Sequence, residues 1–176
     1  RKNRGLEFME NILELDKQRY SGGGVPRFLQ LYRKAQMSKN PFLHKIYKKL
    51  FEISTKKKGI EFSVDNEIGY GFYVGHPYGI TINAKAIIGN NVNIHKGVTI
   101  GQENRGKRKG TPCIGNNVWI GVNATIVGNV VIGNDVLIAP NTYINCDIPD
   151  HSIVFGNPCI VKHADDATKD YINHAV

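Results

Sequence analysis

The sequence predicts a mainly β protein, a parallel β-helix built from six-residue repeats, with an α-helical region before it. Isoleucine recurs with a period of six over two long runs. Residues 1–60 instead place apolar side chains near helical spacing, and one polar, basic segment interrupts the repeats. Together with a length of 176 residues, these observations suit one domain with a small appendage.

The helical region is expected to cover residues 1–59. Apolar residues from Leu6 to Leu15 lie near helical spacing, SGGG at 21–24 interrupts the pattern, and Pro26 can open a second helix. A third helix should follow Asn40-Pro41. Residues 1–60 carry 15 Lys/Arg against 5 Asp/Glu. We interpret these charges as solvated helix faces and the apolar stripes as packing surfaces, and we favour this over contact with an anionic membrane surface.

The repeats begin after Gly59. A period of six does not match the 3.6-residue turn of an α-helix, but it fits short extended pieces, three of which make one coil. Each repeat isoleucine should then point into the axis and stack on the isoleucine three repeats away, while glycines and Asn-Asn pairs supply turns with positive φ. The isoleucines are at 82, 88, 94, 100, 114, 120, 126, 132, 138 and 144. Four positions after them lie the small or β-branched residues Ala86, Val92, Val98, Val118, Ala124, Val130, Val136, Thr142 and Ile148.

The repeat changes phase once. Ile114 follows Ile100 by two full periods and two further positions, and GQENRGKRKGTPC lies between them. We interpret this segment as a loop extruded from the solenoid. Its composition leaves open whether it is functional or a tolerated surface insertion.

Several classes of function are not favoured. No apolar run reaches the length of a membrane span, and no signal-peptide pattern opens the chain. Three widely spaced cysteines fit reduced thiols and a cytoplasmic location. The basic loop lacks the interleaved aromatic residues of a nucleic-acid site. A three-histidine zinc site is not expected, because only His76 and His95 lie in the central coils.

With the repeats and the loop both in view, the chain resembles the hexapeptide acyltransferases. The segments GYGFYVGHPYGITIN, INAKAIIGNNVNIHKGVTIG, IGNNVWIG and IPDHSIVFGNPCIV are similar to the serine acetyltransferase branch, over residues 59–163. The resemblance implies a left-handed β-helix, acetyl-CoA as co-substrate without a metal, and a homotrimer. We place the helical region at 1–59, the acetyltransferase domain at 60–163, and a tail, possibly helical, at 164–176.

The resemblance also implies a catalytic pair. His76 in GHPYGI takes the place of the family's catalytic histidine, and Glu61 falls where the family has its partner aspartate. The chemistry agrees, because a hydroxyl that attacks a thioester must lose its proton, and a carboxylate can fix the tautomer of the histidine that takes it. Gly75, Tyr78 and His95 are tentative acceptor-binding residues.

Departures from the family pattern concern the acceptor. The aspartate before the family's catalytic histidine is Gly75 here, and the Arg-His pair of its loop is Gly110-Thr111. We therefore expect the acceptor to be a sugar hydroxyl in polysaccharide synthesis. Serine is the alternative acceptor, and a non-catalytic β-helical binding module is the alternative of another class.

Coenzyme A contacts in this family run along the groove between subunits and use backbone groups beside small residues. By position, the candidates are Gly101, Gly121, Ala124 and Ala139. Lys162, Arg105 and Lys107 are candidates for its phosphates.

Overall fold

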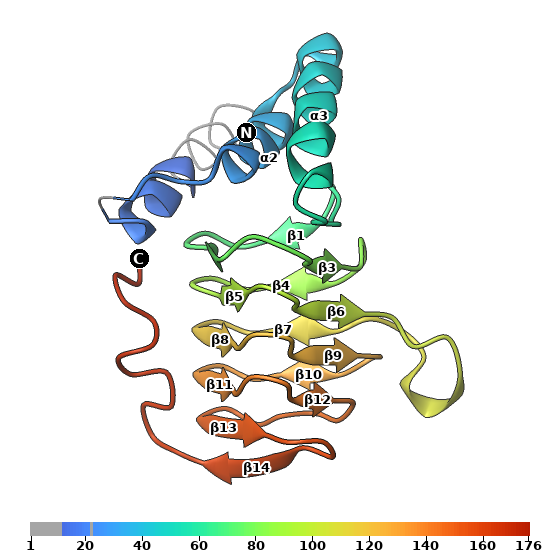
Figure 1. Cartoon of the computed structure of the whole chain (residues 1–176), viewed down its shortest axis with the longest axis vertical. Helices are drawn as coiled ribbons and strands as arrows, with labels where there is room; N and C mark the ends of the chain where they lie inside the picture. Colours follow the sequence, from blue (N-terminus) through green and yellow to red (C-terminus); the bar gives the residue numbers. More distant parts are fainter. Residues whose placement is uncertain (1–11, 22) are drawn as a thin grey trace, which may run out of the picture.

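The computed structural model describes residues 12–21 and 23–176, which form a parallel β-helix with helices at one end (Figure 1). The predicted fold class is therefore confirmed. Residues 12–19 are helical. The rest of the first expected helix, from Leu6 to residue 11, lies outside the described residues.

The next two helices begin close to the predicted prolines. Helix α2 spans Arg27–Met37, and Pro26 precedes it at φ −52° and ψ 137° without being part of it. Helix α3 spans Pro41–Lys56, and the side chain of Asn40 accepts hydrogen bonds from the backbone N–H groups of Phe42 and Leu43. This N-terminal cap satisfies donors that have no partner within the helix.

A buried ion pair fixes the helices on the first coil. Arg33 Nε donates to Asp16 Oδ2 at 2.8 Å, and both side chains are almost fully buried. Arg33 Nη1 also donates to the carbonyl of Ile68, and Asp16 accepts the N–H of Gly71. Burial raises the pKa of Asp16, although Arg33 opposes the shift. Because both charges are paired and hydrogen-bonded, removing one of them would leave the other buried without a partner.

Helix α3 corrects one expectation from the sequence. We expected its apolar stripe to pack on the rest of the protein, and Phe51 does so, against the rings of Tyr32 and Phe62. Tyr47 is also packed, partly buried, against the core. Five other apolar side chains of the helix remain substantially exposed. These are Phe42, Leu43, Ile46, Leu50 and Ile53.

The coils place their short strands in three parallel ladders. Sheet B contains β1 (Glu67–Ile68), β4 (Ile87–Ile88), β7 (Cys113–Ile114) and β10 (Val131–Ile132). Sheet C contains β2 (Tyr73–Gly75), β5 (Asn93–His95), β8 (Val118–Ile120), β11 (Val136–Ile138) and β13 (Ser152–Phe155), with β14 (Ile160–His163) antiparallel at its edge. Sheet A contains β3 (Thr81–Ile82), β6 (Thr99–Gly101), β9 (Thr125–Val127) and β12 (Tyr143–Ile144).

The repeat isoleucines point into the axis as predicted. All ten are at most 3% exposed, and the nine residues four positions after them are buried too. Ile82 pairs with Ile100, and Ile120 with Ile138, at the predicted separation of three repeats. Stacking of this kind buries a continuous core that no single coil could form alone.

The phase change is larger than the sequence suggested. Ile88 pairs with Ile114 and Ile100 with Ile126, so the coil that carries the loop steps directly from Ile100 to Ile114. The sequence suggested that the step from Ile100 to Ile114 stands for two periods of six, but in the structure it replaces a single period. The insertion is therefore eight positions beyond the period of six, and it leaves the ladders in register.

Asparagines take the left-handed conformation at the corners, as the Asn-Asn pairs predicted. Asn91 and Asn117 have φ of 54° and 53°, and Asp135 has 53° at the equivalent corner. Short polar side chains tolerate this region better than most non-glycine residues.

Residues 164–176, called the tail below, run back along sheet C toward the N-terminal helices (Figure 1). The tail consists of turns and bends, and the helix that we allowed for there is absent. Across residues 12–21 and 23–176, no helix combines the length and apolar character needed to cross a bilayer.

Candidate active site

His76 lies at the corner where the chain leaves β2 for sheet A. Its side chain is exposed, and its backbone has φ of 53°, an uncommon value for a residue that precedes proline. Tyr78, two residues on, is 56% exposed. The ammonium group of Lys58 lies 4.4 Å from the centre of the Tyr78 ring and 3.4 Å from its hydroxyl.

Glu61 lies at the start of the solenoid, in a parallel bridge with Thr81 beside sheet A. Its backbone N–H donates to Ile80 O at 2.7 Å, and its side chain is exposed. In the described part of the chain, no hydrogen bond joins the Glu61 carboxylate to His76. The catalytic pair therefore stays a prediction.

His95 is the more constrained histidine of the two. Its Nδ1 lies 2.9 Å from the carbonyl oxygen of Ile120, and its ring is 4.7 Å from that of Trp119. A carbonyl can only accept, so Nδ1 carries the proton and Nε2 keeps its lone pair. Burial lowers the pKa of His95, and the nearby His76 lowers it further, against the hydrogen bond to Ile120. The lowered pKa favours the neutral ring, in which Nε2 is a hydrogen-bond acceptor.

Gly75 makes room for the His95 ring. The two residues are paired across β2 and β5. A Cβ at position 75 would lie 2.7 Å from His95 Cδ2 and 2.9 Å from Nε2. An aspartate there, as in the family pattern, would collide with the ring in its observed place.

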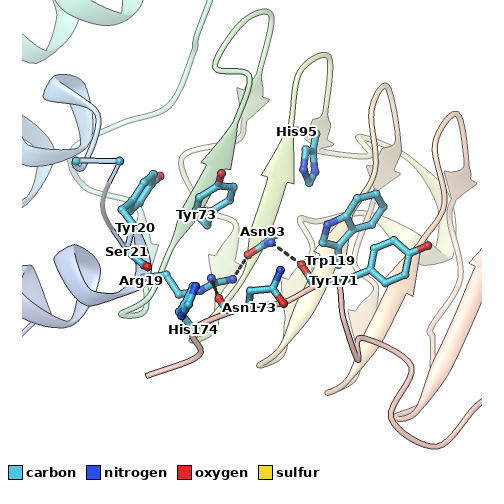
Figure 2. Close-up of a pocket in the computed structure, with 12 residues that line it drawn as sticks. Arg19, Tyr20, Ser21, Tyr73, Asn93, His95, Trp119, Tyr171, Asn173 and His174 are labelled. Atoms are coloured by element: carbon cyan, nitrogen blue, oxygen red, sulfur yellow. Dashed lines mark hydrogen bonds between the residues drawn. The ribbon is translucent and has the colours of Figure 1, made fainter.

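A pocket of about 610 Å³ opens beside His95, between sheet C, the segment near residue 20 and the tail (Figure 2). We call it the sheet-C pocket. Sequence reasoning missed it apart from the tentative His95. A signal existed, because Tyr73, Asn93 and Trp119 each come one residue before an inward residue of sheet C and pair in one ladder. Its lining includes the side chains of Arg19, Tyr20, Tyr73, Asn93, His95, Trp119 and Tyr171.

The extruded loop forms a second pocket. Glu103 and Gly110 exchange two backbone hydrogen bonds of 3.0 Å at the base of the loop, and Arg108 Nη1 lies 3.2 Å from Asp147 Oδ1. This loop pocket, of about 630 Å³, is lined by Arg105 and Lys107 together with Arg108, Val127, Tyr143 and Cys146. Two of the three predicted phosphate-binding side chains thus line one pocket, together with the acidic Glu103. Thr111, where the family has a histidine, donates its hydroxyl to Lys85 O.

The other coenzyme A candidates lie apart from that pocket. Lys162 is on β14, with Nζ 5.6 Å from the Phe155 ring centre, and it does not line the loop pocket. Ala124 is fully buried, whereas Ala139 is half-buried. A Cβ on Gly121 would lie 2.6 Å from Pro140 N, and one on Gly101 would lie 3.2 Å from Val127 Cγ1. Gly121 is therefore first of all a packing requirement between coils.

Metal ligands do not gather in the described residues. No group of three or more His, Cys, Asp or Glu side chains there is placed to hold an ion. His151 Nδ1 lies 2.9 Å from Asp135 Oδ2, and Asp135 also accepts hydrogen bonds from the backbone of the tail.

Residues 114–146 match the family model described as "Bacterial transferase hexapeptide (six repeats)". Helicobacter pylori serine acetyltransferase is 32% identical over 129 residues, covering 73% of this chain and 75% of that protein. The chain belongs to the serine acetyltransferase family. Arabidopsis thaliana serine acetyltransferase 2 is also 32% identical, over 83% of this chain, but the chain spans only 49% of that relative's length.

Solved structures agree with this assignment. Neisseria gonorrhoeae serine acetyltransferase in complex with serine is similar with a TM-score of 0.69 and 25% identity, over 89% of this chain and 69% of that one. Entamoeba histolytica serine acetyltransferase isoform 3 in complex with cysteine gives a TM-score of 0.66 and 28% identity, over 93% and 64%.

Proposed function

We propose that the chain is an acetyl-CoA-dependent O-acetyltransferase. The observation that carries the proposal is His76, the GHPYGI histidine, exposed at a corner of a hexapeptide β-helix that belongs to the serine acetyltransferase family. Among the described residues, the His76 side chain is exposed and makes no hydrogen bond or ion pair.

In the proposed reaction, His76 takes the proton of the acceptor hydroxyl as the oxygen attacks the thioester carbonyl. The tetrahedral intermediate then collapses, the C–S bond breaks, and the imidazolium returns the proton to the departing thiolate of coenzyme A. Glu61 would orient the imidazole and stabilise its charged form, if the two side chains meet when substrate is bound. Arg105 and Lys107 would attract the phosphates of coenzyme A to the loop pocket.

L-Serine is the acceptor that the comparisons favour, because the similar proteins are named serine acetyltransferases. It was our alternative, and the expected role in polysaccharide synthesis finds no support among them. One observation keeps the acceptor open, namely that Gly75 and Thr111 replace side chains which the family pattern uses to hold an amino acid. A cytoplasmic site of action also stays a prediction.

The test is acetyl transfer by the purified chain, followed as thiol release from acetyl-CoA with L-serine as first acceptor. His76→Ala should lower kcat by about 10²- to 10⁴-fold, the usual size of a general-base effect, with the circular dichroism spectrum unchanged. Glu61→Gln should lower kcat less while leaving KM for acetyl-CoA in place. Full activity of His76→Ala would contradict the mechanism. A harmless Glu61→Gln beside an inactive His76→Ala would remove only the pairing.

A further inference from the structure

The sheet-C pocket has the size and the position of an acceptor site. Its volume of about 610 Å³ falls within the roughly 300–1,000 Å³ of ordinary small-molecule sites. His95 lines it, and His95 pairs with Gly75, the residue before His76. The pocket therefore lies beside the end of β2, from which His76 follows, although His76 does not itself line it.

The charge of the pocket disfavours an ammonium group. Within the described part of the chain, its lining includes Arg19 but neither Asp nor Glu. The Arg19 guanidinium donates to Asn173 O and to Asn93 Oδ1, both uncharged, and its buried Nε has no hydrogen-bond partner. Burial lowers the pKa of Arg19. An amino-acid zwitterion could place its carboxylate near Arg19, but its ammonium group would meet no carboxylate in this lining.

Aromatic rings form the walls of the pocket. The Trp119 ring meets that of Tyr171 edge to face, with centres 5.1 Å apart, and Tyr20 and Tyr73 lie 4.8 Å apart on the other side (Figure 2). Such rings present flat apolar faces, while the tyrosine hydroxyls and the indole N–H offer uncharged polar groups at the ring edges. They suit a ligand that is itself a ring with apolar C–H faces and polar edges.

One acceptor atom is already fixed in place. His95 donates through Nδ1 to Ile120 O, so Nε2 is left as a hydrogen-bond acceptor. This nitrogen lies beside Gly75, which has no side chain to cover it. A ligand hydroxyl is a donor that fits an uncharged imidazole nitrogen of this kind.

We propose that the sheet-C pocket is the acceptor site, that it binds a hydroxylated sugar-like ring without an ammonium group, and that His95 Nε2 accepts a hydrogen bond from the ring. The proposal rests on the acetyl transfer proposed above and concerns its acceptor alone. It predicts that L-serine is a poorer ligand of this chain than of its relatives.

Trp119 makes a binding test independent of catalysis, because it is the single tryptophan of the chain and lines the pocket. We would titrate His76→Ala protein with free hexoses, N-acetylhexosamines, nucleotide-linked hexoses and L-serine, and follow tryptophan fluorescence. At least one ring compound should change the signal saturably, at concentrations where L-serine does not. Because the His76→Ala variant needs no turnover, a failed transfer reaction would not affect this measurement.

A second binding experiment measures the same titration on the variant His95→Gln, with His44→Gln as its control. His44 also has Nδ1 against a backbone carbonyl, Ala35 O at 3.0 Å, but it lies on α3 away from the pocket. His95→Gln should raise Kd for the ring compound at least about tenfold, the equivalent of one hydrogen bond, with an unchanged melting temperature. His44→Gln should not alter Kd. The proposal is overturned if no ring compound binds, if L-serine binds better than every ring, or if His95→Gln leaves Kd within twofold.

Discussion

His76 and His95 belong to neighbouring coils and have opposite environments. His76 is exposed and has no fixed partner in the described residues, so no hydrogen bond fixes its tautomer. His95 is held by Ile120 O and packed on Trp119, which leaves it one tautomer. A residue that must gain and lose a proton benefits from the first environment, and a residue that only orients a ligand benefits from the second.

Gly75→Ala should displace His95 without unfolding the chain. The added Cβ would lie 2.7 Å and 2.9 Å from two ring atoms, so the ring must move and its bond to Ile120 must lengthen or break. Once the ring is more exposed, the main cause of its low pKa weakens, and that pKa should rise toward the ordinary value of about 6.5. An NMR titration of the imidazole C–H signals would measure it.

Gly23→Ala is the matched control for this substitution. Gly23 borders the same pocket, yet a Cβ there has only Tyr20 O nearby, at 3.4 Å. It should leave the pKa of His95 where it is. An unshifted His95 pKa in Gly75→Ala would show that the ring adapts without losing its environment.

At the scale of elements, one carboxylate holds the first part of the tail. Asp135 accepts hydrogen bonds from the Thr168 hydroxyl, the backbone N–H groups of Thr168 and Ala167, and His151. Burial alone would raise the pKa of Asp135, but these bonds outweigh it and hold the pKa below the ordinary value. The same contact raises the pKa of His151.

The stabilisation that Asp135 and His151 give to the tail should therefore depend on pH and be limited to a window. Asp135 stabilises the folded state above its unfolded pKa of about 3.9, and this contribution is lost as pH falls through the lower folded pKa. His151 contributes below its unfolded pKa of about 6.5, and its share is lost as pH rises through the higher folded pKa. The protection factor of the Thr168 amide, which is its hydrogen exchange corrected for the intrinsic pH dependence, should be highest between these limits.

Asp135→Asn should speed that exchange at pH 6 by about tenfold or more, since the charge-assisted bonds become neutral ones. Asparagine suits the positive φ of the site, so the corner itself should persist. Asp165→Asn is the control, because Asp165 is exposed and pairs with His163 rather than binding the tail as Asp135 does. Equal exchange in both variants would mean that other contacts hold the tail.

The sequence predicted those elements whose residues repeat. A period of six is enough to decide which isoleucines enter the core, because every coil imposes the same geometry. The period could not give the register across the loop, since Ile100 and Ile114 could be one or two repeats apart. The sheet-C pocket could not be predicted from the sequence, because the contact between Trp119 and Tyr171 forms only when the tail folds back along sheet C. The apolar stripe of α3 identified a helix but not what covers it.

For the whole molecule, stability should depend on the stacked isoleucines. Ile126→Ala removes a fully buried side chain that stacks between Ile100 and Ile144, and it should cost about 2–5 kcal/mol of unfolding free energy. Ile160→Ala, at a position 53% exposed, should cost far less. Urea denaturation followed by circular dichroism would compare them, and equal losses would contradict the stacked core.

The predicted homotrimer has a surface that favours assembly. Ile87, Cys113 and Val131 pair along the outside of sheet B, and all three side chains are exposed. Sedimentation equilibrium should give three times the chain mass of 19.6 kDa. Val131→Lys should shift the protein toward smaller species if this ladder is the contact. A trimer unaffected by Val131→Lys would place the contact elsewhere, and a monomeric parent chain would refute the assembly.

The returning tail changes how the stack can come apart. Coils that touch only their neighbours can peel away one at a time from an end. Here the last coil continues into a segment whose Tyr171 and Val176 carbonyls are held by Asn93 and Asn91 of a much earlier coil, and whose Asn173 carbonyl is held by Arg19 from the N-terminal region. Fraying at the bottom must therefore release contacts at the top, which joins the two ends of the solenoid into one unfolding unit.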